Sequence, residues 1–204
     1  KTISFNNIKS KPIPSWFRGF SAPIKFSSEL SIQNKIYLAS SDTDPFNRWD
    51  SAQSLWLEYV LNPDQVIEKD LFQMIKNLFN NESDYSLLSE MISLPSEQII
   101  HQNVGKINVQ QVHNQRSQSI LSIASTFKDE LLELYDQLNA PKAFDLSTQS
   151  IGERALKNKC LSYLSKLGEY DIAYQQFIKA ECMTDQFGAF QCLLDSENPY
   201  RVEV

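Results

Sequence analysis

Apolar residues recur three and four positions apart over most of this chain, from about residue 31 to residue 194. This spacing places them along one side of an α-helix, whereas a half-buried strand alternates apolar and polar residues with a period of two. The chain holds 5 glycines and 8 prolines among its 204 residues, so turn-forming residues are too few for a protein of many strands. The sequence therefore predicts an all-α fold.

Capping residues and prolines divide this region into helices. Asp44 followed by Pro45 is typical of a helix start, and Gly168 occupies the position where a left-handed residue ends a helix. The region from Asn108 to Leu138 is predicted to be one helix of about 30 residues, or roughly 45 Å at 1.5 Å per residue. The other expected N-caps are Ser31, Ser83, Ser147 and Thr184. We expect seven or eight antiparallel helices in an irregular, solenoid-like array.

Residues 1–26 do not follow the helical pattern. Pro12, Pro14 and Pro23 each remove a backbone donor and favour extended geometry in the preceding residue. We therefore expect two parts, a short extended β segment or connector at residues 1–26 and an α-helical domain at residues 27–204. Because the chain opens with Lys1 and a strand-like sequence, we also expect it to be cut from something longer.

Charge and motif content exclude several classes of function. The net charge of −6 repels phosphate, which argues against nucleic acid or an anionic membrane as a partner. No apolar run reaches the 18 or so residues that a membrane span requires. The three cysteines form no CxxC pair, which favours a reducing compartment and a cytoplasmic location. Because HExxH, GxxxxGK[ST], GxGxxG and GxSxG are all missing, we predict no catalytic residue and no metal ligand in these residues.

Several side chains could bind a ligand, but each also has a structural interpretation. Trp49 and Trp56 share a stripe with other apolar residues, which favours the core over ligand stacking. Arg48 could bind a ligand carboxylate or pair with acids on the surface of its own helix, and we favour the second. Arg18 could likewise bind a carboxylate or staple the connector to the helices, and stapling is again favoured.

The remaining candidates are acids, a thiol and an imidazole. Asp129, Glu130 and Glu133 could form an acidic patch for a metal or a peptide amine, but they alternate with leucines and more simply form the solvated side of a helix. Cys160 lies in an apolar stripe, which predicts an inert, buried thiol. His113 has no acidic or cysteine partner four residues away and is expected at the surface or as a satisfied histidine.

Four stretches of the sequence, in order, resemble the bacterial aminopeptidase N family. Residues 11–25, KPIPSWFRGFSAPIK, resemble the stretch that enters the helical C-terminal domain, and residues 44–53, DPFNRWDSAQ, resemble an early helix of that domain. Residues 151–164, IGERALKNKCLSYL, and the turn at 183–185 agree as well, although Cys182 replaces the family's asparagine. The residues that carry the resemblance include Pro14, Ser15, Arg18, Phe20, Ser21, Pro23, Asp44, Phe46, Arg48, Trp49, Arg154, Asn158, Met183, Thr184 and Asp185.

The resemblance implies a role inside a larger enzyme. Members of the family are zinc aminopeptidases that remove N-terminal residues from peptides, and their HExxH and GAMEN motifs lie in an upstream domain. This chain would then be a non-catalytic part of the helical domain that caps the active-site cleft, without zinc of its own. Its partners would be the upstream catalytic and β-sandwich domains, with peptide substrates binding the parent enzyme. The alternative is a free-standing helical-repeat adaptor for a protein or peptide. A third alternative, a small-molecule pocket between the helices, has no residue that points to it in the sequence.

Overall fold

The structure, a computed structural model, describes residues 7–21, 24, 29–62, 65–104, 108–140, 143–195 and 197–204. These residues form ten α-helices and one short 3-10 helix, and no strand occurs among them, which confirms the predicted all-α fold. The helices are α1 (Ile32–Ser41), α2 (Pro45–Leu61), α3 (Gln65–Asn81), α4 (Tyr85–Met91), α5 (Glu97–Asn103), α6 (Val109–Thr126), α7 (Lys128–Leu138), α8 (Thr148–Lys166), α9 (Tyr170–Lys179) and α10 (Met183–Leu194).

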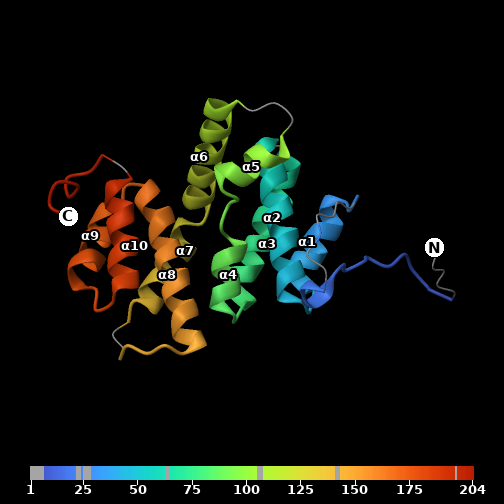
Figure 1. The fold of residues 1–204 in the computed structure, drawn as a ribbon, viewed down its shortest axis with the longest axis horizontal. Helices are drawn as coiled ribbons and strands as arrows, with labels where there is room; N and C mark the ends of the chain where they lie inside the picture. Colours follow the sequence, from blue (N-terminus) through green and yellow to red (C-terminus); the bar gives the residue numbers. More distant parts are fainter. Residues whose placement is uncertain are drawn as a thin grey trace.

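The helices form an elongated array that begins with α1 at one end and finishes with α9 and α10 at the other (Figure 1). Neighbours along the chain pack in pairs, as α1 with α2 and α9 with α10 do. The pairing is irregular because α8 contacts α4, α6, α7, α9 and α10, of which α4 and α6 lie far from it in sequence. This central helix joins the two halves of the array.

One hydrophobic core runs through both halves. Trp56 of α2 is completely buried, and its indole Nε1 donates to the carbonyl oxygen of Met91 over 2.7 Å. Tyr163 of α8 reaches the same turn, where its hydroxyl donates to the carbonyl oxygen of Ile92 over 2.6 Å. Both bonds satisfy carbonyl groups at the end of α4 that would otherwise lack an intrahelical partner.

Most predicted helix boundaries are confirmed. Ser31, Asp44, Asn108 and Ser147 each accept a hydrogen bond from a backbone amide of the first helical turn. Gly168 has a φ of 90°, the left-handed conformation expected after α8.

Two predicted N-caps are wrong. Asp84, not Ser83, caps α4, because its carboxylate Oδ1 accepts from the amide of Leu87 over 3.0 Å. Helix α10 begins at Met183 after Cys182, so Thr184 lies in its first turn and does not cap it. A carboxylate at position 84 also interacts favourably with the helix dipole, which a serine hydroxyl cannot do.

The predicted helix of about 30 residues is two helices, α6 and α7, separated at Phe127. Phe127 has φ and ψ of −109° and 23° and is 2% exposed. Its ring lies 5.3 Å from that of Phe72 and 5.4 Å from that of Phe79, both on α3. The break between α6 and α7 therefore coincides with burial of Phe127 against α3, which local helix propensity does not predict.

The N-terminal connector is held by side chains, and its described residues contain no strand. Arg18–Phe20 form a 3-10 turn. Gly19 and Phe20 within it have φ values of 63° and 53°, and Phe17, immediately before it, has a φ of 52°. The rest of the predicted β segment at residues 1–6, 22–23 and 25–26 lies outside the described residues, Pro23 included. Because residue 26 also lies outside the described residues, the division there stays a prediction.

Candidate functional site

The first two family-like stretches meet at a clamp between the connector and α2. Arg18 Nη1 lies 2.5 Å from Asp42 Oδ1, and Arg18 Nη2 donates to Thr43 Oγ1 over 2.5 Å. The Asp42 side chain is only 2% exposed, whereas the Arg18 side chain is 47% exposed. Arg18 therefore staples the connector to the turn before α2, as the favoured interpretation predicted.

Asp44 accepts hydrogen bonds from both α2 and the connector. Its Oδ1 accepts from the amide of Asn47 over 3.0 Å and caps α2, while its Oδ2 accepts from the amide of Gly19 over 2.6 Å. The Gly19 amide, followed by that of Asn47, lowers the pKa of Asp44 below its ordinary value. The Oγ of Ser15 accepts a further hydrogen bond from Asn47 Nδ2 over 2.7 Å. The clamp thus consists of Ser15, Arg18, Gly19, Asp42, Thr43, Asp44 and Asn47.

Arg48 and the aromatic residues of the same motif extend the clamp into the helices. Arg48 Nη2 lies 2.6 Å from Glu82 Oε2, and its Nε donates to the carbonyl oxygen of Ala39 over 3.0 Å. Its partner is an acid beyond α3, not one on its own helix, which corrects that prediction. Phe46 lies edge-on to Phe20 with 5.0 Å between ring centroids.

The predicted tryptophan stripe is confirmed along most of α2. Trp56 is fully buried, and Trp49 is partly buried against the core. Phe46, at the start of the stripe, is 37% exposed. Neither tryptophan is therefore a free stacking platform for a ligand.

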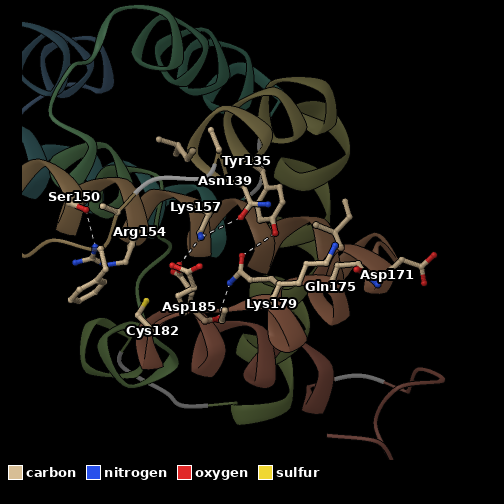
Figure 2. Close-up of a pocket in the computed structure, with 18 residues that line it drawn as sticks. Tyr135, Asn139, Ser150, Arg154, Lys157, Asp171, Gln175, Lys179, Cys182 and Asp185 are labelled. Carbon is tan, nitrogen blue, oxygen red and sulfur yellow. Dashed lines mark hydrogen bonds and ion pairs between the residues drawn. The ribbon is translucent and has the colours of Figure 1, made fainter.

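The third and fourth family-like stretches meet in a buried polar network between α8 and α10 (Figure 2). Lys157 Nζ lies 2.6 Å from Asp185 Oδ2, with both side chains about nine-tenths buried. Asn158 Nδ2 donates to the other oxygen, Asp185 Oδ1, over 3.0 Å. The two stretches, which residues 165–182 separate in the sequence, therefore form one structural unit.

Helices α7 and α9 complete this network. Gln176 Nε2 donates to Asn158 Oδ1 over 2.7 Å and to the Asp185 carbonyl oxygen over 2.8 Å. Tyr135 donates its hydroxyl to Gln176 Oε1 over 3.0 Å, and burial raises the pKa of this phenol. Each buried polar group has a partner, as a buried network requires if it is to stabilise a fold.

A cleft of about 950 Å³ opens beside the network, between α8, α9 and the turn that leads into α10. Figure 2 shows Lys157 pointing toward Asp185 and Asn139, and Arg154 beside Ser150. The Arg154 guanidinium carbon lies 4.9 Å from the centroid of the Phe144 ring. A second hollow, of about 300 Å³, lies on the other side of α8 beside Asn158 and Gln191, so the cleft next to Arg154 is the larger of these two.

The other residues of the family-like motifs do not converge on a reactive centre. Met183 is 82% exposed, and Ser21 and Thr184 are also exposed. The Thr184 carbonyl oxygen accepts from Asn158 Nδ2 over 3.5 Å, and Pro14 is half-buried in the connector.

The remaining sequence candidates are accounted for by their surroundings. Cys160 is fully buried, and burial raises the pKa of its thiol to about 12, which makes it inert as predicted. His113 Nδ1 lies 2.8 Å from Glu97 Oε1 at the surface. Asp129 and Glu133 are exposed, and Glu130 Oε1 lies 3.4 Å from Lys76 Nζ.

Within the described ranges, no three histidine, cysteine, aspartate or glutamate side chains lie together so that they could hold a metal ion. The residues described here therefore do not fit the zinc that the resemblance implies for the parent enzymes. None of the described helices is long and apolar enough to cross a bilayer.

Comparison with known families decides which fold family this arrangement represents. Residues 32–204 match the model of a domain of unknown function, DUF3458_C, described as ARM repeats. The chain belongs to this family. ARM repeats are stacked helices, in agreement with the solenoid-like array of the DUF3458_C domain seen here.

Individual relatives of this DUF3458_C chain confirm the resemblance to aminopeptidase N. Aminopeptidase N from Escherichia coli (strain K12) is 29% identical over 216 residues, covering 98% of the chain and 24% of that protein. Aminopeptidase N from Caulobacter vibrioides is 28% identical over 170 residues, covering 80% of the chain and 20% of that protein. A solved structure of Legionella pneumophila aminopeptidase A in complex with aspartic acid matches with a TM-score of 0.79 and 25% identity, covering 97% of the chain and 26% of that protein. The chain thus spans about a quarter of the length of these relatives.

Several residues of both sites are not singled out by any sequence motif. Asp42 and Thr43 precede the second motif, and Lys157 and Gln176 carry no pattern that distinguishes them from surface residues of a helix. Lys157 lies next to Asn158 inside a family-like stretch, which was the one available signal. Its carboxylate partner could not be identified, because the Lys157–Asp185 pair depends on how α8 and α10 pack.

Proposed function

We propose that this chain is the helical cap region of an aminopeptidase N-type enzyme, one that removes N-terminal residues from peptides. The observation that carries the proposal is the similarity to aminopeptidase N over 98% of the chain, at 29% identity. The chain contributes no catalytic residue in this proposal. Zinc and the attacking water belong to an upstream domain, and the enzyme works in the cytoplasm.

The clamp suggests how such a cap is attached. Arg18, Gly19 and Ser15 are bound by residues at the start of α2, so the connector leaves the helical domain in a fixed direction. In the proposed enzyme, this connector joins the cap to a β-sandwich domain and through it to the catalytic domain. The clamp then sets where the cap lies over the cleft that peptides enter.

The first experiment tests the isolated chain. We expect the purified 204-residue protein to contain less than stoichiometric zinc and to leave alanine and leucine p-nitroanilides intact, with Escherichia coli aminopeptidase N as the positive control. One zinc per chain, or appreciable turnover by the chain alone, would overturn the proposal.

A second experiment tests the cap itself in a larger protein. In a full-length enzyme that carries this region, Arg18→Gln removes the ion pair to Asp42 and should loosen the attachment of the cap. We expect kcat/KM for long peptides to rise relative to that for leucine p-nitroanilide, while Lys166→Gln, far from the clamp, leaves the ratio unchanged. An identical ratio in both variants would contradict the capping role.

A helical-repeat adaptor is the second candidate, and the ARM-repeat description of the family favours it. Such arrays use their extended surfaces to bind proteins or peptides. The gene sequence upstream of Lys1 distinguishes the two candidates. An HExxH motif encoded several hundred residues before Lys1 would support the enzyme.

A further inference from the structure

The cleft beside α8 contains a buried cation without a carboxylate partner. Arg154 is 9% exposed, and its Nη1 donates to Ser150 Oγ over 2.9 Å and to the Asp145 carbonyl oxygen over 3.1 Å. Among the residues that the structure describes, no carboxylate lies within ion-pairing distance of this guanidinium. Both of its acceptors are neutral, so the positive charge of Arg154 is not compensated.

Two other poorly exposed cations are paired, whereas the partly buried Lys159 and Arg116 have no carboxylate within ion-pairing distance among the described residues. Lys157 lies against Asp185, and the Arg48 side chain, 15% exposed, lies against Glu82. An unpaired buried charge is unfavourable, so a fold retains one only where something compensates it. Arg154 Nε and Nη2 have no protein partner in the described residues, yet neither atom is sealed from solvent. Because Arg154 lines the cleft, these N–H groups border the space that a small molecule would occupy.

The surroundings of Arg154 define the charge that such a molecule should carry. The Phe144 ring packs against the guanidinium and helps to fix its orientation. Lys179, exposed at the end of α9, lines the same cleft and adds a second positive charge without a described partner. Asp171 and Glu181 also line it and disfavour a ligand with several negative charges. These four charges sum to zero, so the cleft has no excess of positive charge that would favour a ligand with more than one negative charge.

We propose that this cleft binds a small organic monocarboxylate, with its carboxylate on Arg154. A guanidinium donates two parallel hydrogen bonds to a carboxylate, and two of its nitrogen atoms, Nε and Nη2, are available for that geometry. Leu138, Ala143 and Ile172 line the cleft and provide apolar contacts for the hydrocarbon part of the ligand. The volume of about 950 Å³ is within the range of pockets that hold small molecules. This site is independent of the proposed aminopeptidase activity.

The three cysteines allow binding to be located. Cys182 lines the cleft and is partly exposed, whereas Cys160 and Cys192 are buried. Burial also raises the pKa of the Cys160 and Cys192 thiols, so a neutral alkylating reagent should modify Cys182 first. A ligand in the cleft should slow this modification.

The test measures protection of Cys182 from iodoacetamide by benzoate in the 204-residue chain. We expect saturable protection by benzoate and none by benzamide, a neutral molecule of nearly the same shape. Phenyl phosphate, with more negative charge, should bind more weakly. Equal protection by benzoate and benzamide, or no protection by either, would overturn the proposal.

Variants then assign the binding to Arg154. Arg154→Gln should weaken benzoate binding by about tenfold or more, as expected for loss of charged hydrogen bonds, and Arg154→Lys should weaken it less. Lys166→Gln, outside the cleft, is the matched control and should bind as the wild type does.

Circular dichroism shows whether each variant is folded. If Arg154→Gln is not folded, Lys179→Gln is the test of the site. Lys179 is exposed, so this substitution should keep the fold and still weaken benzoate binding severalfold. A folded Arg154→Gln variant that binds benzoate as tightly as the wild type would contradict the proposal. If Arg154→Gln is not folded, wild-type affinity in Lys179→Gln would contradict it.

Discussion

Lys157 of α8 and Asp185 of α10 form a buried ion pair, with 2.6 Å between Nζ and Oδ2. Removal of one partner leaves the other charge buried and unpaired. We therefore expect Asp185→Ala to lower the free energy of unfolding by about 3–5 kcal/mol, measured by urea denaturation with circular dichroism.

The matched control for this pair is Lys166 with Asp195, which lie 3.8 Å apart and are more exposed. Asp195→Ala should change stability by less than about 1 kcal/mol, because exposed pairs contribute little. Equal effects of the two substitutions would show that the α8–α10 network does not stabilise the fold.

Trp56 provides a second prediction, because it joins α2 to the turn after α4 through its bond to the Met91 carbonyl oxygen. Trp56→Phe keeps an aromatic ring but removes the donor and leaves that carbonyl group buried. The expected loss is about 1–3 kcal/mol from the unsatisfied acceptor, with some further loss of packing. Tyr37→Phe, at a position that is 57% exposed, is the control and should change the thermal midpoint little. A Trp56→Phe protein as stable as the wild type would contradict the assigned hydrogen bond.

Gly152 on α8 allows the close approach of α4. A Cβ atom added there would lie 2.7 Å from Ser86 Oγ and 2.9 Å from the Ser86 backbone nitrogen. Gly152→Ala should therefore destabilise the protein by about 1–3 kcal/mol from overpacking, although alanine favours a helix over glycine by about 1 kcal/mol. Scanning calorimetry checks the sign, with the exposed substitution Gln149→Ala on the same helix as the control. A raised melting temperature for Gly152→Ala would mean that α4 moves away without strain.

Asp44 predicts a dependence of stability on pH. The amides of Gly19 and Asn47 lower its pKa in the folded state below the ordinary value of 3.8. Because the folded state then holds this proton less tightly than the unfolded state, the stabilisation is complete above a pH of about 3.8. It is lost as the pH falls through the lower pKa of the folded protein.

The measurement for this prediction is the stability difference between the wild type and Asp44→Asn. We expect this difference to be constant near pH 6 and to shrink below a pH of about 3.8. Thr43→Val, which removes a clamp hydroxyl without a titrating group, should give a constant difference over the same range. A difference for Asp44→Asn that does not change with pH would contradict the role of the carboxylate.

Local signals in the sequence predicted the helices and many of their ends. Ser31, Asp44 and Ser147 cap helices through bonds to residues only a few positions away, so their role depends on neighbours in the chain. The break at Phe127 was not predicted, because it involves rings of α3 about fifty residues earlier.

The sequence alone determined the all-α class, the solenoid-like array and the resemblance to aminopeptidase N, since periodicity, caps and motif spacing are properties of short stretches. Only the tertiary structure decided which charges meet. Arg48 pairs with Glu82, and Arg154 has no described carboxylate within ion-pairing distance, because the packing of helices sets distances between residues far apart in the chain. Burial then gives those pairs and unpaired charges their energetic weight, which no local pattern of residues contains.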